Sequence, residues 1–157
     1  MKTLVIVFSY HHKNTEKIAQ VIAKVLDAQI KSPQDTGFDE LKKYDLIGFG
    51  AGIDSGKHYR ELLDFADALP QVTDKKAIIF STSGIAGEKK LAKDHSALRG
   101  KLQSKGYIII DEFNCPGFNT NSFLKLFGGI NKGRPNREDL KHAEEFAMNL
   151  KKNIRGL

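Results

Sequence analysis

The sequence of 157 residues has no tryptophan, a single cysteine and only two methionines. The one cysteine, Cys115, cannot form a disulfide within the chain. The sequence also has no Cys-x-x-Cys motif and no paired Cys/His spacing of the kind that holds zinc or an iron–sulfur cluster. We therefore expect neither a disulfide framework nor a metal site.

The chain also lacks a long hydrophobic run. Its longest apolar stretches, residues 4–8 and 46–53, are far shorter than the ~18 residues that a membrane-spanning helix needs. The N-terminus shows no basic region followed by an apolar stretch and a small-residue cleavage site. These absences predict a cytoplasmic protein without a membrane span.

Acidic residues are in the minority. The 25 Lys and Arg residues outnumber the 19 Asp and Glu residues, which gives a net charge of +6. Such an excess would suit nucleic acid, an acidic protein partner or a phosphorylated ligand. The lysines, however, are spread from Lys2 to Lys152 and do not form one block with interleaved aromatic residues. This distribution favours a solvated surface and argues against a nucleic-acid partner.

What remains is the composition of a compact protein, with 40% hydrophobic and 28% charged residues. A chain of this length buries about 70% of its unfolded surface around one core. We expect residues 1–157 to form a single domain.

Short apolar runs alternate with amphipathic segments along the chain. Strand patterns cover residues 3–8, 45–51, 76–81 and 107–114, with a weak one at 28–32, and helix patterns cover 14–27, 59–69, 88–105 and 137–154. Strands without polar alternation need helices on both faces, and β-α-β order with right-handed crossovers makes the sheet parallel. The order therefore predicts an α/β fold with a doubly wound parallel sheet of about five strands.

In such a sheet, ligands bind at the carboxyl ends of the strands. The loops to consider are residues 9–14, 52–57, 82–87 and 115–121. The last of these opens a connection, residues 115–136, that is longer than usual and therefore suggests a functional or self-packed loop.

The first loop concentrates groups that bind anions. Hydroxyls, an amide, two imidazoles and an ammonium lie next to a predicted helix start, where free backbone N–H groups and the helix dipole favour a phosphate. The residues are Ser9, Tyr10, His11, His12, Lys13, Asn14 and Thr15. The alternative is an ordinary helix cap, for which Asn14 or Thr15 alone would be enough.

Residues 6–22 resemble the phosphate-loop motif of flavodoxins: a strand, a hydroxyl-rich loop, Asn14-Thr15, and a helix with Ala19 four residues after the threonine. Two positions depart from that motif, since Tyr10 replaces the usual Ser or Thr and Lys13 replaces the usual small residue. If position 13 needs a positive φ, lysine costs about 1 kcal/mol relative to glycine there. The resemblance extends over most of the chain and implies a flavodoxin-like sheet of order 2-1-3-4-5 that binds FMN.

The same resemblance implies roles for the other loops. The second loop would flank the isoalloxazine ring with Ala51, Gly52, Ile53, Asp54, Ser55 and Gly56. Because tryptophan is absent, the stacking residue stays open between Ile53, His58 and Tyr59. The third loop would bind the pyrimidine edge of the flavin through Thr82, Ser83 and Gly84. Plain turns are the alternative for both loops.

The remaining candidates are weaker. Cys115 ends the last strand and is included with the cofactor-binding residues, although a lone thiol is more typical of apolar packing than of a nucleophile. His95 and His142 lie in helix patterns without a ligand partner at i+4, so we expect ordinary surface or half-buried helix residues. The sequence has no Ser-His-Asp order with a serine in the nucleophile-elbow motif Gly-x-Ser-x-Gly, which is typical of α/β hydrolases.

These features favour a protein that binds one FMN noncovalently and carries electrons, with no catalytic acid or base, because the cofactor supplies the redox chemistry. An FMN-dependent oxidoreductase acting on quinone or NAD(P)H is the alternative, and residues 52–59 also resemble the corresponding loop of flavodoxin-type protoporphyrinogen oxidases. A non-redox ligand-binding module is a third possibility. The charge of +6 predicts a redox partner with an acidic face.

Overall fold

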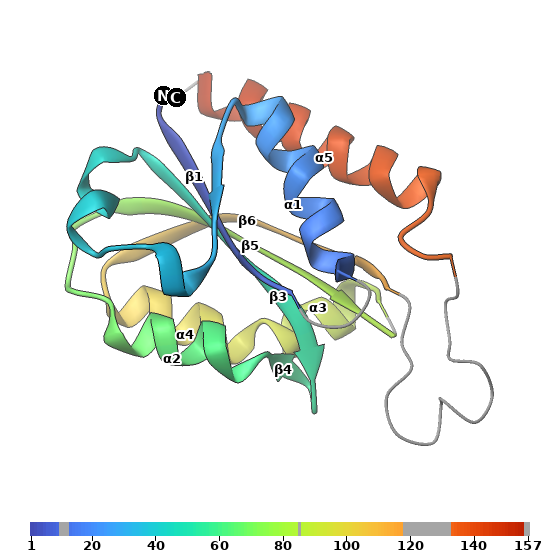
Figure 1. The fold of residues 1–157 in the computed structure, drawn as a ribbon, viewed down its shortest axis with the longest axis horizontal. Helices are drawn as coiled ribbons and strands as arrows, with labels where there is room; N and C mark the ends of the chain where they lie inside the picture. The colour runs from blue at the N-terminus through green and yellow to red at the C-terminus, as the bar shows by residue number, and fades with distance from the viewer. Residues whose placement is uncertain (10–12, 85, 118–132, 156–157) are drawn as a thin grey trace.

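The computed structural model describes residues 1–9, 13–84, 86–117 and 133–155, and strands alternate with helices through these ranges (Figure 1). The strands are β1 (Thr3–Phe8), β2 (Gln29–Lys31), β3 (Leu46–Asp54), β4 (Lys57–His58), β5 (Lys75–Ser83) and β6 (Tyr107–Pro116). The helices are α1 (Asn14–Leu26), α2 (Arg60–Ala68), α3 (Glu88–Asp94), α4 (Ser96–Ser104) and α5 (Arg137–Arg155), with short 3-10 helices at Pro33–Asp35 and Asp39–Lys43. No helix in the described ranges is long and apolar enough to cross a membrane.

Five strands form a parallel sheet in the order β2-β1-β3-β5-β6. This arrangement confirms the expected α/β fold with order 2-1-3-4-5. The sixth strand, β4, was not expected; it is a two-residue segment that pairs antiparallel with the end of β3.

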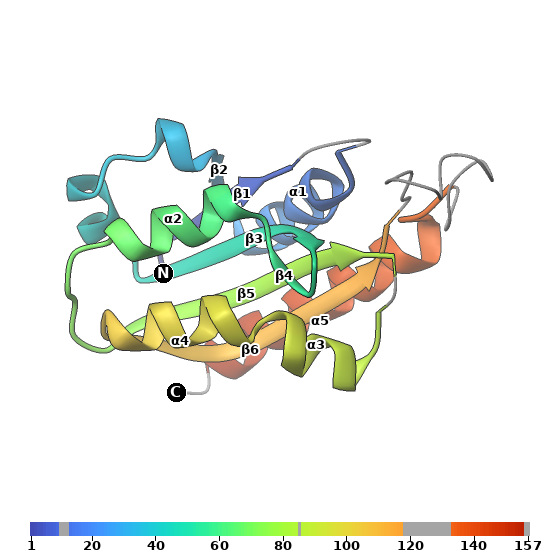
Figure 2. The ribbon, with the colours of Figure 1, turned by 90° about the horizontal axis from the view of Figure 1, so that it is seen from below.

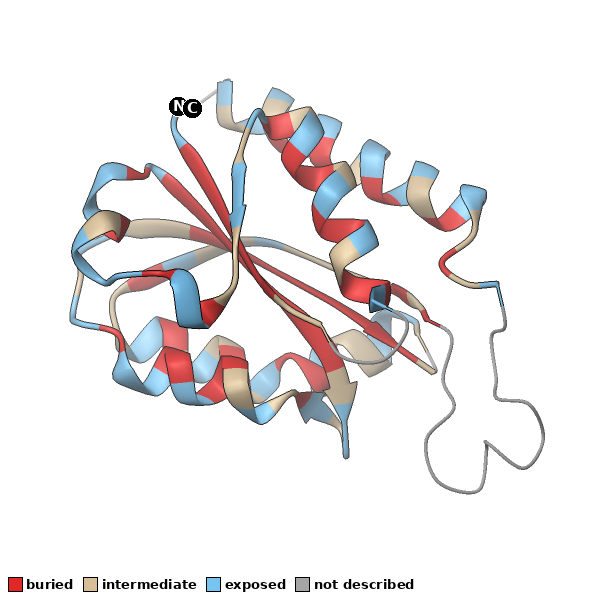
Figure 3. Ribbon diagram, in the orientation of Figure 1, coloured by how far each residue is buried: buried red, intermediate tan, exposed pale blue. Residues whose placement is uncertain are grey.

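Helices cover both faces of the sheet, with α1 and α5 on one side and α2 and α4 on the other (Figure 2). Successive strand residues point to opposite faces, so Leu4 and Ile6 pack toward α2 and α4, whereas Val5 and Val7 pack toward α1 and α5. The middle strands are buried along almost their whole length (Figure 3). This two-sided burial explains why the strand sequences are continuous apolar runs.

A glycine in β3 allows one of these cores to close. A Cβ atom at Gly50 would lie 2.1 Å from the Phe80 ring of the neighbouring strand. Phe80 is fully buried in the core on the α1 side. Glycine is therefore required at position 50 by the ring that lies across it.

Two expected loops turn out to be partly strand. β3 continues through Asp54 and β5 through Ser83, so residues 52–54 and 82–83 lie in the sheet. Beyond β3 the chain forms a hairpin in which Asp54 pairs with Lys57. Both turn residues, Ser55 and Gly56, have positive φ, as a type I′ turn in a two-residue hairpin requires.

The expected helix over residues 88–105 is also wrong in detail, because it divides into α3 and α4 at His95. His95 is fully buried, and its ring bonds to side chains of β5 and β6. The helical periodicity of the sequence does not encode that inward turn.

Candidate functional site

The carboxyl ends of β1, β3, β5 and β6 meet at one edge of the sheet. Strand pairing places Gly52 beside Thr82, and Thr82 beside Cys115. One strand over, Phe8 pairs with Ala51. Residues that are far apart in the sequence and were predicted to share a site therefore form adjacent rows at this edge.

The first loop, which leads into α1, contains a buried polar atom without a hydrogen-bond partner among the described residues. Lys13 precedes the helix in the left-handed conformation, with φ of 51°, and its side chain does not cap the helix. Ser9 follows β1, and its hydroxyl oxygen is buried with no hydrogen-bond partner among the described residues. Position 13 therefore has the positive φ at which lysine was expected to be less favourable than glycine. Tyr10, His11 and His12 lie outside the described residues.

Contacts between loops tie α1 to β5 and β6. The hydroxyls of Thr15 and Thr82 are 2.8 Å apart in a buried position. Gly117 donates its N–H to the Ser83 carbonyl at 2.9 Å, and a Cβ at Gly117 would lie 2.8 Å from the Asn14 amide nitrogen. The first, third and fourth loops therefore pack as one unit, with Asn14, Thr15, Thr82 and Ser83 buried in it.

The hairpin after β3 supplies the remaining side of the site. Tyr59, just beyond it, lies against Gly52, where a Cβ would be 2.7 Å from the tyrosine ring. The same ring meets Phe8 edge-on with centroids 6.3 Å apart. Burial, and then the negative charge of Asp54, raises the pKa of Tyr59, so its hydroxyl stays protonated at neutral pH.

One stacking candidate is excluded. His58 points into the protein, with 1% of its surface exposed, and its Nε2 lies 3.1 Å from the Phe80 carbonyl oxygen. A ring that is buried in this way cannot lie against a flavin. Ile53 and Tyr59 are half-buried and remain candidates.

Behind the edge lies a buried polar chain that sequence reasoning missed. The Ser81 hydroxyl is 2.7 Å from His95 Nε2, and His95 Nδ1 is 2.9 Å from a Glu112 carboxylate oxygen. Arg99 donates two hydrogen bonds to that carboxylate, at 2.8 and 2.9 Å. Burial raises the pKa of Glu112, but the hydrogen bonds from His95 and Arg99 outweigh it and bring the pKa to about 2.

The order serine, histidine and carboxylate is that of a hydrolytic triad. Ser81 and His95, however, are 1% and 0% exposed, so no substrate reaches the hydroxyl. This series of hydrogen-bonded side chains therefore has a structural role and not a catalytic one. No sequence signal marks it, because its residues are far apart and in no motif.

The thiol of Cys115 is a packing group. Burial, and then the negative charge of Asp139, raises the pKa of Cys115 to about 12. At neutral pH the thiol therefore stays protonated and is a poor nucleophile. Cys115 lies in the core on the α1 side.

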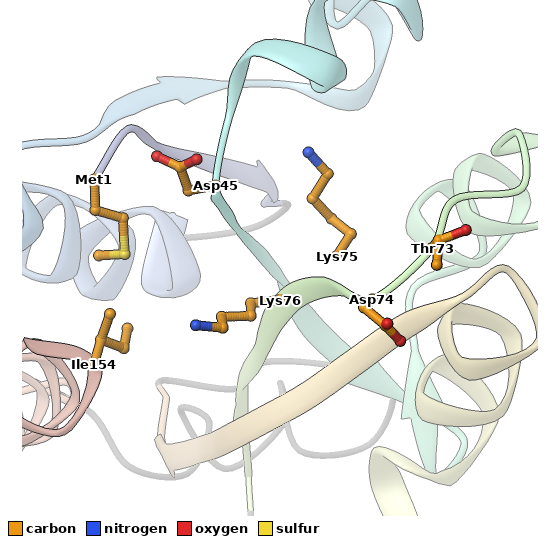
Figure 4. A pocket seen from close by; sticks show the side chains of 7 residues that line it. All are labelled: Met1, Asp45, Thr73, Asp74, Lys75, Lys76 and Ile154. Atoms are coloured by element: carbon orange, nitrogen blue, oxygen red, sulfur yellow. The ribbon is translucent and has the colours of Figure 1, made fainter. Parts of the chain in front are cut away.

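A separate cavity of about 470 Å³ opens at the opposite edge of the sheet (Figure 4), lined by Met1, Asp45, Thr73, Asp74, Lys75, Lys76 and Ile154. The Lys75 ammonium is engaged there, since it donates to the Tyr44 carbonyl at 2.5 Å. This cavity contains none of the predicted site residues. Within the described part of the chain, no three His, Cys, Asp or Glu side chains cluster in a way that could hold a metal ion.

The comparisons with known proteins agree with this geometry. Residues 5–115 match the family model of the flavodoxin domain. A protein described as uncharacterized from Methanocaldococcus jannaschii is 48% identical over 153 residues, which are 98% of this chain and 100% of that protein. The chain therefore belongs to the flavodoxin domain family.

Solved structures show the same fold. Flavodoxin 2 from Bacillus cereus superposes with a TM-score of 0.73 at 20% identity, over 98% of this chain and 99% of that chain. Flavodoxin 1 from Bacillus cereus has a TM-score of 0.65 at 26% identity, over 93% and 95% of the two chains. A flavodoxin from the domain Archaea has a TM-score of 0.65 at 16% identity over 99% of both chains.

Proposed function

We propose that this protein is an electron carrier that binds one FMN noncovalently at the carboxyl edge of its sheet. The observation that carries the proposal is the buried Ser9 hydroxyl, which has no partner among the described residues and lies in the loop before the uncapped start of α1. A phosphate would satisfy that hydroxyl together with N–H groups of the first helical turn, which have no partner within a helix. The site residues thus fit the phosphate end of FMN.

The phosphate end would be held by Ser9, Lys13, Asn14 and Thr15, joined by Tyr10, His11 and His12. The ring would lie between residues 51–56, which comprise the end of β3 and the hairpin turn, and the end of β5, with Thr82, Ser83 and Gly84 at its pyrimidine edge and Cys115 packed behind. Ile53 or Tyr59 would cover the ring. When bound, FMN accepts and donates electrons, and these residues bind it, orient it and exclude water.

An electron carrier needs no catalytic acid or base of its own, and we propose none for this protein. The redox partner would present an acidic face to this basic protein, and the protein would work in the cytoplasm as one domain. An FMN-dependent oxidoreductase is the second candidate, favoured by the resemblance of residues 52–59 to a loop of flavodoxin-type protoporphyrinogen oxidases.

Reconstitution tests the proposal. The protein incubated with FMN and then desalted should show flavin absorbance, and calorimetry should give one FMN per chain with clear preference over riboflavin. A desalted protein without flavin absorbance would refute FMN binding, and equal affinity for FMN and riboflavin would refute the phosphate site. Steady-state turnover with quinone, NAD(P)H or protoporphyrinogen would show that the protein is an FMN-dependent oxidoreductase and not an electron carrier.

A further inference from the structure

His95 of the polar chain and the buried His58 belong to one cluster beneath the hairpin. The rings of His58 and His95 are in contact, with centroids 4.8 Å apart and planes inclined by 47°. His58 bonds to the carbonyl of Phe80, and His95 bonds to the hydroxyl of the next residue, Ser81. Both rings are therefore attached to consecutive residues near the end of β5.

The hydrogen-bond partners fix the tautomers. A carbonyl oxygen only accepts, so His58 Nε2 carries the proton and donates it to Phe80. The Glu112 carboxylate likewise only accepts, so His95 donates from Nδ1. In the neutral His95 ring, Nε2 is then an acceptor, and the Ser81 hydroxyl donates to it.

Glu112 and Arg99, which are partly exposed, fix the position of the His95 ring. Arg99 donates to both carboxylate oxygens of Glu112, and the two side chains are 25% and 18% exposed. A carboxylate held by a two-pronged guanidinium contact is a fixed acceptor. His95 is thereby fixed from β6 and can in turn fix Ser81 and His58.

The hairpin depends on this support. Its second strand, β4, has only two residues, and it pairs with β3 through Ile53–His58 and Asp54–Lys57. A pair of such short strands is marginal without further packing. His58 supplies that packing, because it joins β4 both to β5 and to the His95 ring.

We propose that His95 is a positioning residue for the flavin ring: through Ser81 and His58 it fixes the end of β5 and the hairpin between which the ring binds. The inference rests on the proposed function, since it assumes that the ring lies there. It assigns His95 to the ring side of the site and not to the phosphate side. His95 touches no ligand itself and acts through its two neighbours.

The affinities for FMN and riboflavin show whether a residue acts on the ring side or on the phosphate side of the site, because riboflavin lacks the phosphate. His95→Leu removes both hydrogen bonds of the ring, and Ser81→Ala removes one of them. We expect His95→Leu to weaken FMN and riboflavin by the same factor, roughly ten- to a hundredfold, and Ser81→Ala to weaken both by a smaller common factor. The conservative His95→Gln keeps an amide for Ser81 and should fall between His95→Leu and the wild type. His142→Gln, an exposed histidine on α5, is the matched control and should leave both dissociation constants unchanged.

Limited trypsin digestion of the flavin-free protein tests the hairpin directly. Lys57 is exposed in the hairpin, and Lys24 is exposed on α1. Local loosening of the hairpin should raise cleavage after Lys57 several-fold in His95→Leu and Ser81→Ala without raising cleavage after Lys24. A merely structural loss of stability would raise both rates together.

The flavin affinities and the trypsin cleavage rates together test the proposed role of His95. Equal weakening of both flavins with selective cleavage after Lys57 supports the proposal. Wild-type affinity for both flavins in a folded variant, weakening of FMN alone, or parallel cleavage at both lysines overturns it. If His95→Leu does not fold, Ser81→Ala carries the same comparison. A wild-type protein that binds neither flavin refutes the proposed function, and the trypsin rates still show whether His95 holds the hairpin.

Discussion

Two threonines from distant parts of the chain meet in the candidate site. Thr15 is the second residue of α1 and Thr82 lies near the end of β5, and their hydroxyl oxygens are 2.8 Å apart. Each hydroxyl has one proton to donate and two lone pairs, so the pair has capacity left for a further partner. That capacity is what a phosphate oxygen would use.

Thr15→Ala tests this use of the hydroxyl. A hydrogen bond to a charged group is worth about 1.5–3 kcal/mol, so FMN should bind roughly ten- to a hundredfold more weakly while riboflavin hardly changes. Calorimetry with both flavins measures the difference. Thr36→Ala removes a hydroxyl that donates to the Ser32 carbonyl and belongs to none of the candidate site's loops, and it should alter neither affinity. Equal losses for FMN and riboflavin in Thr15→Ala would contradict the phosphate contact.

His58 gives the stability a dependence on pH. Burial, and then the electrostatic interaction with the neighbouring His95 ring, lowers the pKa of His58 from 6.5 to about 3. Because the folded pKa lies below the unfolded one, the stabilisation is complete above pH ~6.5 and is lost as the pH falls toward ~3. The depressed pKa of Glu112 adds to the loss at the acid end of that window, below pH ~4.5.

Urea unfolding at pH 7.5 and pH 5 measures the effect of His58. The free energy of unfolding should drop on the order of 1–2 kcal/mol between these values. His58→Gln removes the titrating ring and should flatten this part of the profile, whereas His142→Gln should keep it. A wild-type profile that stays flat from pH 7.5 to 5 would show that His58 is not held neutral.

At the level of elements, glycines in a strand and in a helix should respond oppositely to the same substitution. A Cβ at Gly50 in β3 would lie 2.1 Å from the Phe80 ring, whereas at Gly100 in α4 nothing lies within 4 Å. Gly50→Ala should therefore cost at least about 2 kcal/mol through overpacking. Gly100→Ala should stabilise the protein by about 0.5–1 kcal/mol, because alanine restricts the unfolded chain and favours helix.

Thermal unfolding checks this pair. For a chain of this size 1 kcal/mol shifts the midpoint by about 2–4 °C, so the two variants should separate clearly on opposite sides of the wild type. A midpoint for Gly50→Ala at or above that of the wild type would mean that Phe80 can move aside without cost.

The sequence predicted the parallel sheet because its strands are buried on both faces, and such strands read as continuous apolar runs at residues 3–8 and 45–51. It predicted a candidate phosphate loop because the residues of that loop are local, all between 9 and 15. The hairpin was missed because Ser55-Gly56 also reads as part of a glycine-rich loop, and β4 has only two residues.

The buried chain from Ser81 to Arg99 was missed for a different reason. His95 is 14 residues from Ser81 and 17 from Glu112, so no local pattern links them. His95 follows a polar helix pattern and was expected at the surface or half-buried, yet its ring is fully buried. Tertiary contacts of this kind follow from strand order and register, which a single sequence specifies only coarsely.

At the scale of the whole molecule, the net charge is +6. One charge ~15 Å from a flavin contributes about 0.3 kcal/mol in water-like dielectric, and screening at ~0.1 M salt reduces that several-fold. Dispersed surface charges should therefore barely move the reduction potential of bound FMN. Association differs, because steering depends on the summed field along the approach path and changes on-rates by roughly ten- to a thousandfold at low salt.

We therefore expect electron transfer with a redox partner that has an acidic face to slow as ionic strength rises from ~20 to ~300 mM, since the Debye length falls from ~20 to ~6 Å over that range. Stopped-flow measurement of flavin oxidation or reduction by a candidate partner gives the rate. Lys57 is exposed in the hairpin beside the proposed site, and Lys42 is exposed at the opposite edge of the sheet. If the partner docks over the flavin, Lys57→Gln should lower the rate at low salt and flatten its salt dependence more than Lys42→Gln does, because a charge near the contact acts over the shortest distance. A rate that rises with salt, or ignores it, would mean that the excess positive charge guides no acidic partner to this edge.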